Sequence, residues 1–114
     1  MKLNEYQKLA LKTDSFDSQN VNVTDPAFVA KVLGLVGEAG EVAEKFKKSM
    51  RKNDGVMKDV EKDLIIRELG DVLWYLSVLA HYLDTELEEV AKTNIAKLAD
   101  RHNRGVIKST GDER

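Results

Sequence analysis

Hydrophobic positions recur at helical spacing along most of the chain and predict two helices in its first half. The first is expected over about 3–13. The second is expected over about 24–52 and begins with three favourable residues, Thr24, Asp25 and Pro26. They offer an N-cap oxygen, an acid near the positive end of the helix dipole, and a proline whose missing N–H costs nothing at the first helical position.

The second half of the chain predicts two more helices. A break at 53–55 (Asn-Asp-Gly) separates the second helix from a third over about 59–84. Thr85 followed by Glu88 has the spacing of a capping box, so a fourth helix is expected to follow at once and to end near 103.

Polar segments join and follow these helices. The stretch 14–23 is rich in Asp, Ser and Asn and is expected to be a loop, and 106–114 is expected to be a polar tail. Because the connections between the three long helices are short, neighbouring helices are expected to run antiparallel. The sequence therefore predicts an all-α fold, a small antiparallel bundle of four main helices occupying residues 1–105.

Composition narrows the class of protein. The chain has 114 residues, enough for one domain, and no cysteine, which excludes disulfides and thiolate metal sites. Eighteen basic against 20 acidic residues make a nucleic-acid partner unexpected. The start of the chain has no apolar signal region, and charges interrupt the most apolar stretch, 64–83. We therefore expect a cytoplasmic protein that does not bind membranes.

The third helix places two acids where apolar residues are expected. On a helical projection, Glu68 and Asp71 fall within the arc that carries Val72, Tyr75 and Val78. Two carboxylates directed toward a core are costly unless a basic side chain, a shared proton or a metal ion neutralises them. Two explanations are therefore weighed for this pair: salt bridges to lysines from another helix, and a bound metal ion.

The second helix carries a similar acidic pair. Glu38 lies at the border of its apolar arc and Glu41 lies further toward the polar side, so this pair alone is also typical of a solvated face. Gly34, Gly37 and Gly40 recur beside the acids, and each costs about 1 kcal/mol relative to alanine in a helix. A helix tolerates such glycines where another backbone or a ligand approaches closely.

If the two helices are antiparallel neighbours, the acidic pairs Glu38/Glu41 and Glu68/Asp71 face each other. Four carboxylates without histidine or sulfur form a hard-oxygen site that suits Mg²⁺, with Mn²⁺ as a substitute. Neither histidine has a glutamate three residues before it, as a di-iron bundle would require. The predicted metal ligands are thus these four acids.

The fourth helix carries groups suited to phosphate. Asn94, Lys97 and Arg101 lie on one side of it, and an arginine can grip phosphate oxygens in a bidentate manner. An amphipathic helix with a basic C-terminal end would show the same pattern, because cations favour that end of a helix.

Three runs of the chain together resemble a known family. Gly-Leu-Val-Gly-Glu-Ala-Gly-Glu (34–41), Glu-Leu-Gly-Asp-Val-Leu-Trp-Tyr-Leu (68–76) and Asn-Ile-Ala-Lys-Leu-Ala-Asp-Arg (94–101) are similar to the MazG-like nucleoside triphosphate pyrophosphohydrolases, of the all-α NTP pyrophosphatase superfamily. The resemblance covers about 5–105. One departure is Gly37, where many members carry a further glutamate.

The resemblance implies a function and a set of site residues. It implies Mg²⁺-dependent cleavage of (d)NTPs to the monophosphate and pyrophosphate by a homodimer or homotetramer. By this resemblance Glu38, Glu41, Glu68 and Asp71 are metal ligands, and Asn94, Lys97 and Arg101 bind substrate, the last two through its phosphates. Glu38 and Glu41 are also the candidates for accepting a proton from the attacking water.

Other assignments remain open at this point. Tyr6 and Gln7 could line a nucleotide pocket, although a core position is favoured for Tyr6. Trp74 is expected to pack against another helix or subunit. The alternative functions are a non-catalytic helical interaction module, whose acids pair with lysines, and a hydrolase of another phosphorylated compound on the same fold.

Overall fold

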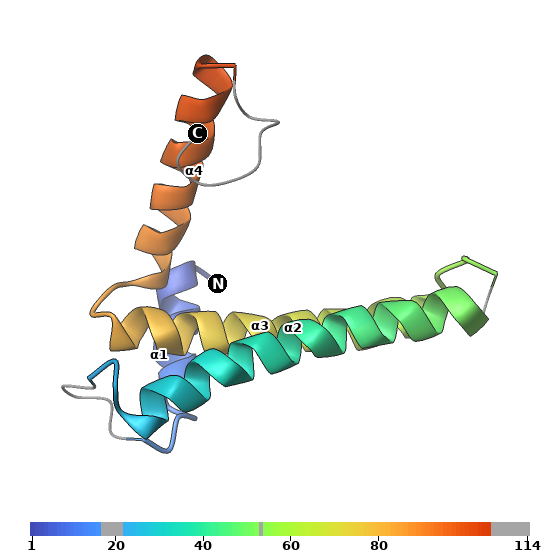
Figure 1. Ribbon diagram of the computed structural model, residues 1–114, viewed down its shortest axis with the longest axis horizontal. Helices are drawn as coiled ribbons and strands as arrows, with labels where there is room; N and C mark the ends of the chain where they lie inside the picture. Colours follow the sequence, from blue (N-terminus) through green and yellow to red (C-terminus); the bar gives the residue numbers. More distant parts are fainter. Residues whose placement is uncertain (17–21, 53, 106–114) are drawn as a thin grey trace.

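The computed structural model describes residues 1–16, 22–52 and 54–105, which form four α-helices and no strand (Figure 1). The four helices are α1 (Leu3–Leu11), α2 (Pro26–Lys52), α3 (Asp59–Tyr82) and α4 (Leu87–Asn103). The all-α prediction is confirmed, with helix ends within a few residues of those expected. Parts of three predicted segments lie outside the described residues. They are the tail at 106–114, the loop at 17–21 and residue 53 of the predicted break.

Helices α2 and α3 form a long antiparallel pair, which is the main packing unit of the chain (Figure 1). Their close approach explains one of the three glycines of α2. A Cβ added at Gly34 would overlap the ring of Tyr75, so only glycine admits this contact. A Cβ added at Gly37 or Gly40 would have no neighbour within 4 Å. These two glycines are not explained by packing among the described residues.

Helix α3 ends in a Schellman turn that redirects the chain. Asp84 adopts a left-handed backbone (φ 56°), the amide of Asp84 donates to the carbonyl of His81 at 2.9 Å, and the amide of Thr85 donates to that of Ala80 at 2.8 Å. Helix α4 then departs from the α2–α3 pair, and within the described residues it packs on α1 and α3 but not on α2 (Figure 1). The expected bundle of four aligned helices is therefore not completed within one chain.

Helix α1 holds the turn between α3 and α4 in place. The Gln7 side chain, 5% exposed, donates to the carbonyls of Ser77 (3.0 Å) and Thr85 (3.2 Å) and accepts from the amide of Leu87 (2.9 Å). Asn4 Oδ1 accepts from the amide of Glu88 at 3.0 Å. The predicted capping box was wrong, because α1 supplies the cap of α4 from 80 residues away. Ser77, whose carbonyl accepts the hydrogen bond from Gln7, is also buried.

A small core lies at the end of the α2–α3 pair nearest α1. Phe28, Val78 and Tyr82 are buried there, and Trp74 packs against them. Packing on this core, which contains Phe28 of α2, confirms the expectation that Trp74 packs against another helix. The Trp74 indole also donates to Thr13 Oγ1, just after α1, at 2.7 Å.

Beside this core, Asp14 joins the end of α1 to the pair. Its carboxylate accepts from the Tyr82 hydroxyl at 2.7 Å and lies 3.2 Å from Lys31 Nζ. Burial alone would raise the pKa of Asp14, but hydrogen bonds from Tyr82 and the Phe16 amide, together with Lys31, outweigh it and lower the pKa.

Away from this core the chain is open. Its radius of gyration is 16.9 Å, whereas a compact domain of this length has about 13 Å. Large apolar side chains on the outer faces of α2, α3 and α4 are exposed, including Leu33 (65%), Val36 (66%), Ile66 (62%) and Ile95 (65%). Within the described residues, no helix is both long enough and apolar enough to cross a membrane.

Candidate metal and phosphate site

Three carboxylates from α2 and α3 converge near the middle of the helical pair. Oxygen atoms of Glu38, Glu68 and Asp71 all lie within 4.8 Å of one another, and we call this group the carboxylate triad. Glu38 comes from α2, and the other two come from successive turns of α3, three residues apart. The antiparallel packing of the two helices therefore creates the cluster that the sequence predicted from the two acidic pairs.

The donor set fits a small hard cation. Mg²⁺ binds oxygen ligands at about 2.1 Å, so two ligands on opposite sides of it are about 4.2 Å apart. Ligands on adjacent corners of the octahedron are about 3 Å apart, so the triad oxygens, which lie within 4.8 Å of one another, would draw closer together to hold the ion. Three carboxylates fill only part of an octahedron and leave positions for water and phosphate oxygens.

The triad is only partly neutralised by the protein. Partial desolvation raises the pKa of Glu38, and the negative charges of Asp71, Glu68 and Glu41 raise it further. Lys45 Nζ lies 3.6 Å from Glu68 Oε1, so the lysine pairing left open by the sequence is present for one of the three acids. One cation among these acids leaves the cluster negative and therefore attractive to a divalent cation.

The surroundings of the acids differ from those the sequence suggested. The Glu68 side chain is 17% exposed and faces α2, whereas Asp71 is exposed at the edge of the pair. The two acids are thus partly open to solvent rather than inside a closed core. This partial access to water lowers the cost of their charges.

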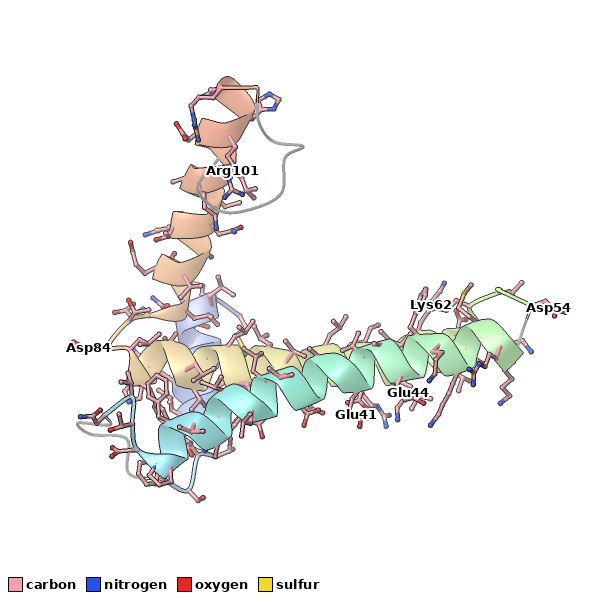
Figure 2. All side chains as sticks on the ribbon, in the orientation of Figure 1. Glu41, Glu44, Asp54, Lys62, Asp84 and Arg101 are labelled. Carbon is pink, nitrogen blue, oxygen red and sulfur yellow. The ribbon has the colours of Figure 1, made fainter. Side chains whose placement is uncertain are left out.

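Glu41, the fourth predicted ligand, does not join the triad. It is exposed and projects outward from α2, as Figure 2 shows. It lies one helical turn from Glu38, near enough for its charge to raise the pKa of Glu38. Glu41 is thus a neighbour of the triad.

The predicted phosphate-binding residues of α4 lie far from the triad in the same chain. Asp71 is about 17 Å along α3 from the end of that helix, and Lys97 is about 15 Å along α4 from its start. Because α4 departs from the pair and does not contact α2, it does not fold back over the triad, and its predicted phosphate-binding residues stay well separated from the three acids (Figure 1). Arg101, near the far end of α4, is 9% exposed (Figure 2). Asn94 and Lys97 line a shallow pocket of about 360 Å³ on α4.

The two N-terminal candidates have different roles. Gln7 is buried in the α3–α4 turn and is structural. Tyr6 is half-buried; desolvation raises the pKa of its hydroxyl, and the charge of Asp71 raises it further. Sequence reasoning missed Lys45 as the partner of Glu68, although its position one turn after Glu41 was visible.

Comparisons with known proteins identify the family of the chain. Residues 29–106 match the family described as the MazG nucleotide pyrophosphohydrolase domain. The chain is 50% identical over 82 residues to the Gene 37 protein of Mycobacterium phage L5, covering 72% of each protein. No solved structure matches the chain. The chain therefore belongs to the MazG nucleotide pyrophosphohydrolase family.

Proposed function

We propose that the protein hydrolyses (d)NTPs to (d)NMP and pyrophosphate in a reaction that requires Mg²⁺, with Mn²⁺ as a substitute. The observation that carries this proposal is the carboxylate triad of Glu38, Glu68 and Asp71, whose oxygens lie within 4.8 Å of one another. Membership of the MazG family supports the reaction class. The triad residues would hold the cation, which neutralises phosphate charge and lowers the pKa of a bound water.

The chain's own residues have distinct tasks in this proposal. Glu68 and Asp71 are fixed on successive turns of one rigid helix and orient the site, while Glu38 closes it from the facing helix. Glu38, within the triad, and Glu41, one turn away from it, are the candidates for accepting the proton of the attacking water. No serine, cysteine or histidine nucleophile is needed, because water attacks the α-phosphorus and pyrophosphate leaves.

The active form in this proposal is a homodimer or homotetramer. Val29, Leu33 and Val36 form an exposed apolar stripe on α2, beside the unexplained glycines Gly37 and Gly40. A second copy packed on such surfaces would bury them, as expected for a chain whose own core is small. It would also bring Asn94, Lys97 and Arg101 of one copy to substrate held by the triad of the other, which a single chain does not achieve.

The first test is incubation with a panel of (d)NTPs, with Mg²⁺ and then with EDTA. Release of monophosphate and pyrophosphate that stops with EDTA is the expected result. Orthophosphate release would indicate that a different bond is cut, and turnover of another phosphorylated compound alone would favour the alternative hydrolase. No turnover by a folded, assembled protein would favour the interaction module, whose supporting observation is the Lys45–Glu68 ion pair.

Variants separate the proposed roles. Asp71→Asn should abolish both turnover and Mg²⁺ binding, whereas Glu41→Gln should reduce kcat and leave Mg²⁺ binding intact. Mixing Asp71→Asn with Lys97→Gln, each nearly inactive, should restore activity if residues from two copies share one site. An inactive mixture that still forms mixed oligomers would refute the shared site.

A further inference from the structure

A second charged feature lies further along the α2–α3 pair, beyond the carboxylate triad. It is a groove of about 330 Å³ between the C-terminal part of α2 and the N-terminal part of α3. We call it the lysine groove, and its lining residues are Lys45, Lys48, Ser49, Lys52, Val60, Glu61 and Leu64. Its volume lies in the range of small-ligand sites rather than of protein interfaces.

The groove is predominantly positive. Positions 45, 48 and 52 fall within one arc of α2, so three ammonium groups share one side of the helix. Among the described residues, the lining holds one carboxylate, Glu61, whose Oε2 is buried and which is engaged in an interaction of its own. Lys48 also lies 3.9 Å from Glu44, an exposed pair of the kind that contributes little and is easily exchanged.

A buried hydroxyl belongs to the same lining. Ser49 is 3% exposed, and its Oγ has no hydrogen-bond partner within the described residues. Buried polar groups are nearly always paired, so an orphaned donor indicates a partner that is not part of the described chain. A serine between lysines on one helix face is a donor set suited to anionic oxygens.

The lysine groove adjoins the triad through Lys45. Lys45 lines the groove, and its Nζ lies 3.6 Å from Oε1 of Glu68, a triad member. An anion held by Lys45 would therefore lie directly beside a cation held by the triad. Lys48 and Lys52 follow at about 4.5 Å and 10 Å further along α2.

We propose that the lysine groove binds the β- and γ-phosphates of the substrate, and hence the leaving pyrophosphate. This inference rests on the proposed function, since it assigns the end of the substrate that points away from the triad. The assignment uses residues of the same chain as the triad, unlike those of α4. The positive charge of the groove also stabilises the charge that develops on pyrophosphate as the bond to the α-phosphorus breaks.

The test is calorimetric titration of inorganic pyrophosphate into the full chain in EDTA, so that no divalent cation links the anion to the triad. The double variant Lys48→Gln/Lys52→Gln should weaken pyrophosphate binding about 10-fold or more. Lys47→Gln is the matched control, because Lys47 is the adjacent exposed lysine of the same helix and does not line the groove. It should leave the affinity within about two-fold of the parent.

Ser49→Ala adds a second readout that a purely structural role would not produce. It should weaken pyrophosphate binding several-fold without lowering the urea midpoint, because it removes a hydroxyl that has no partner in the fold. A lower urea midpoint with unchanged pyrophosphate affinity would overturn the assignment of Ser49 to the groove.

The outcomes separate this inference from the proposed function. If the parent turns over (d)NTPs while the double variant binds pyrophosphate as tightly as the control does, pyrophosphate binding in the lysine groove is refuted and the proposed function stands. If the parent turns over no nucleotide but loses pyrophosphate binding only in the groove variants, the anion site stands and the function is refuted. A parent that binds no pyrophosphate in EDTA would overturn the inference directly.

Discussion

Replacing Gln7 with methionine tests how α4 is held against the rest of the chain. The substitution keeps the length and most of the volume of the side chain but removes three hydrogen bonds, to Ser77, Thr85 and Leu87. Gln7 is 5% exposed, so water does not readily replace them.

The expected loss of stability follows from the backbone groups that would be left without their hydrogen bonds to Gln7. Losing a hydrogen bond to each of two carbonyls costs about 0.5–1.5 kcal/mol apiece, and an unpaired amide at Leu87 costs about 1–3 kcal/mol. The free energy of unfolding should therefore fall by about 3 kcal/mol, a large share of the 5–15 kcal/mol typical of a domain. For a chain of this length, that corresponds to a fall in Tm of roughly 12 °C.

Urea unfolding followed by circular dichroism measures this change, with Lys8→Met as the control on the exposed neighbouring residue. The control should stay within about 0.5 kcal/mol of the parent. If Gln7→Met also stays within that range, then Gln7 does not anchor the α3–α4 turn and the reasoning fails.

Three further predictions concern packing, acid stability and metal. Gly34→Ala should lower the free energy of unfolding by about 1–3 kcal/mol, because the added Cβ meets the ring of Tyr75. Gly37→Ala should raise it by up to about 1 kcal/mol, because a Cβ there meets nothing within 4 Å. Equal urea midpoints for the two variants would contradict this prediction. Because folding lowers the pKa of Asp14, its ionised carboxylate stabilises the folded state at pH values above the pKa that Asp14 has in the unfolded chain. This stabilisation is lost as the pH falls through the lower pKa of the folded state. Unfolding of Asp14→Asn compared with the parent across pH should thus show a deficit at pH 7 that disappears in acid. Millimolar Mg²⁺ should raise the Tm of the parent in a thermal-shift assay but not that of Asp71→Asn, and a flat response in the parent would count against the triad.

Local sequence signals were sufficient for the helices but not for the contacts that join them. The proline and its preceding acid placed the start of α2 correctly at Pro26. The capping box at Thr85 failed because Gln7 and Asn4, distant in sequence, supply the cap of α4. No local pattern reveals a partner about 80 residues away.

The candidate site was likewise predicted only in part from the sequence. Two acidic pairs on neighbouring helices predicted that carboxylates would meet, and three of the four do so in the triad. The helical projection placed Glu38 at the border of the apolar arc and Glu41 further toward the polar side, but only the packing of α2 on α3 showed that Glu38 reaches the other two acids and Glu41 does not. The projection also could not show that Lys45 pairs with Glu68, or that Ser49 is buried beside it.

The order of residues by itself determined four helices, their approximate ends and the presence of facing acids, because helical periodicity and helix-start signals act over a few residues. Tertiary structure alone decided that α4 leaves the α2–α3 pair, that Gln7 holds it there, and that Asn94, Lys97 and Arg101 lie far from the triad of their own chain. The physical reason is that a turn and a few long-range hydrogen bonds set the direction of a helix, whereas its periodicity specifies only its faces.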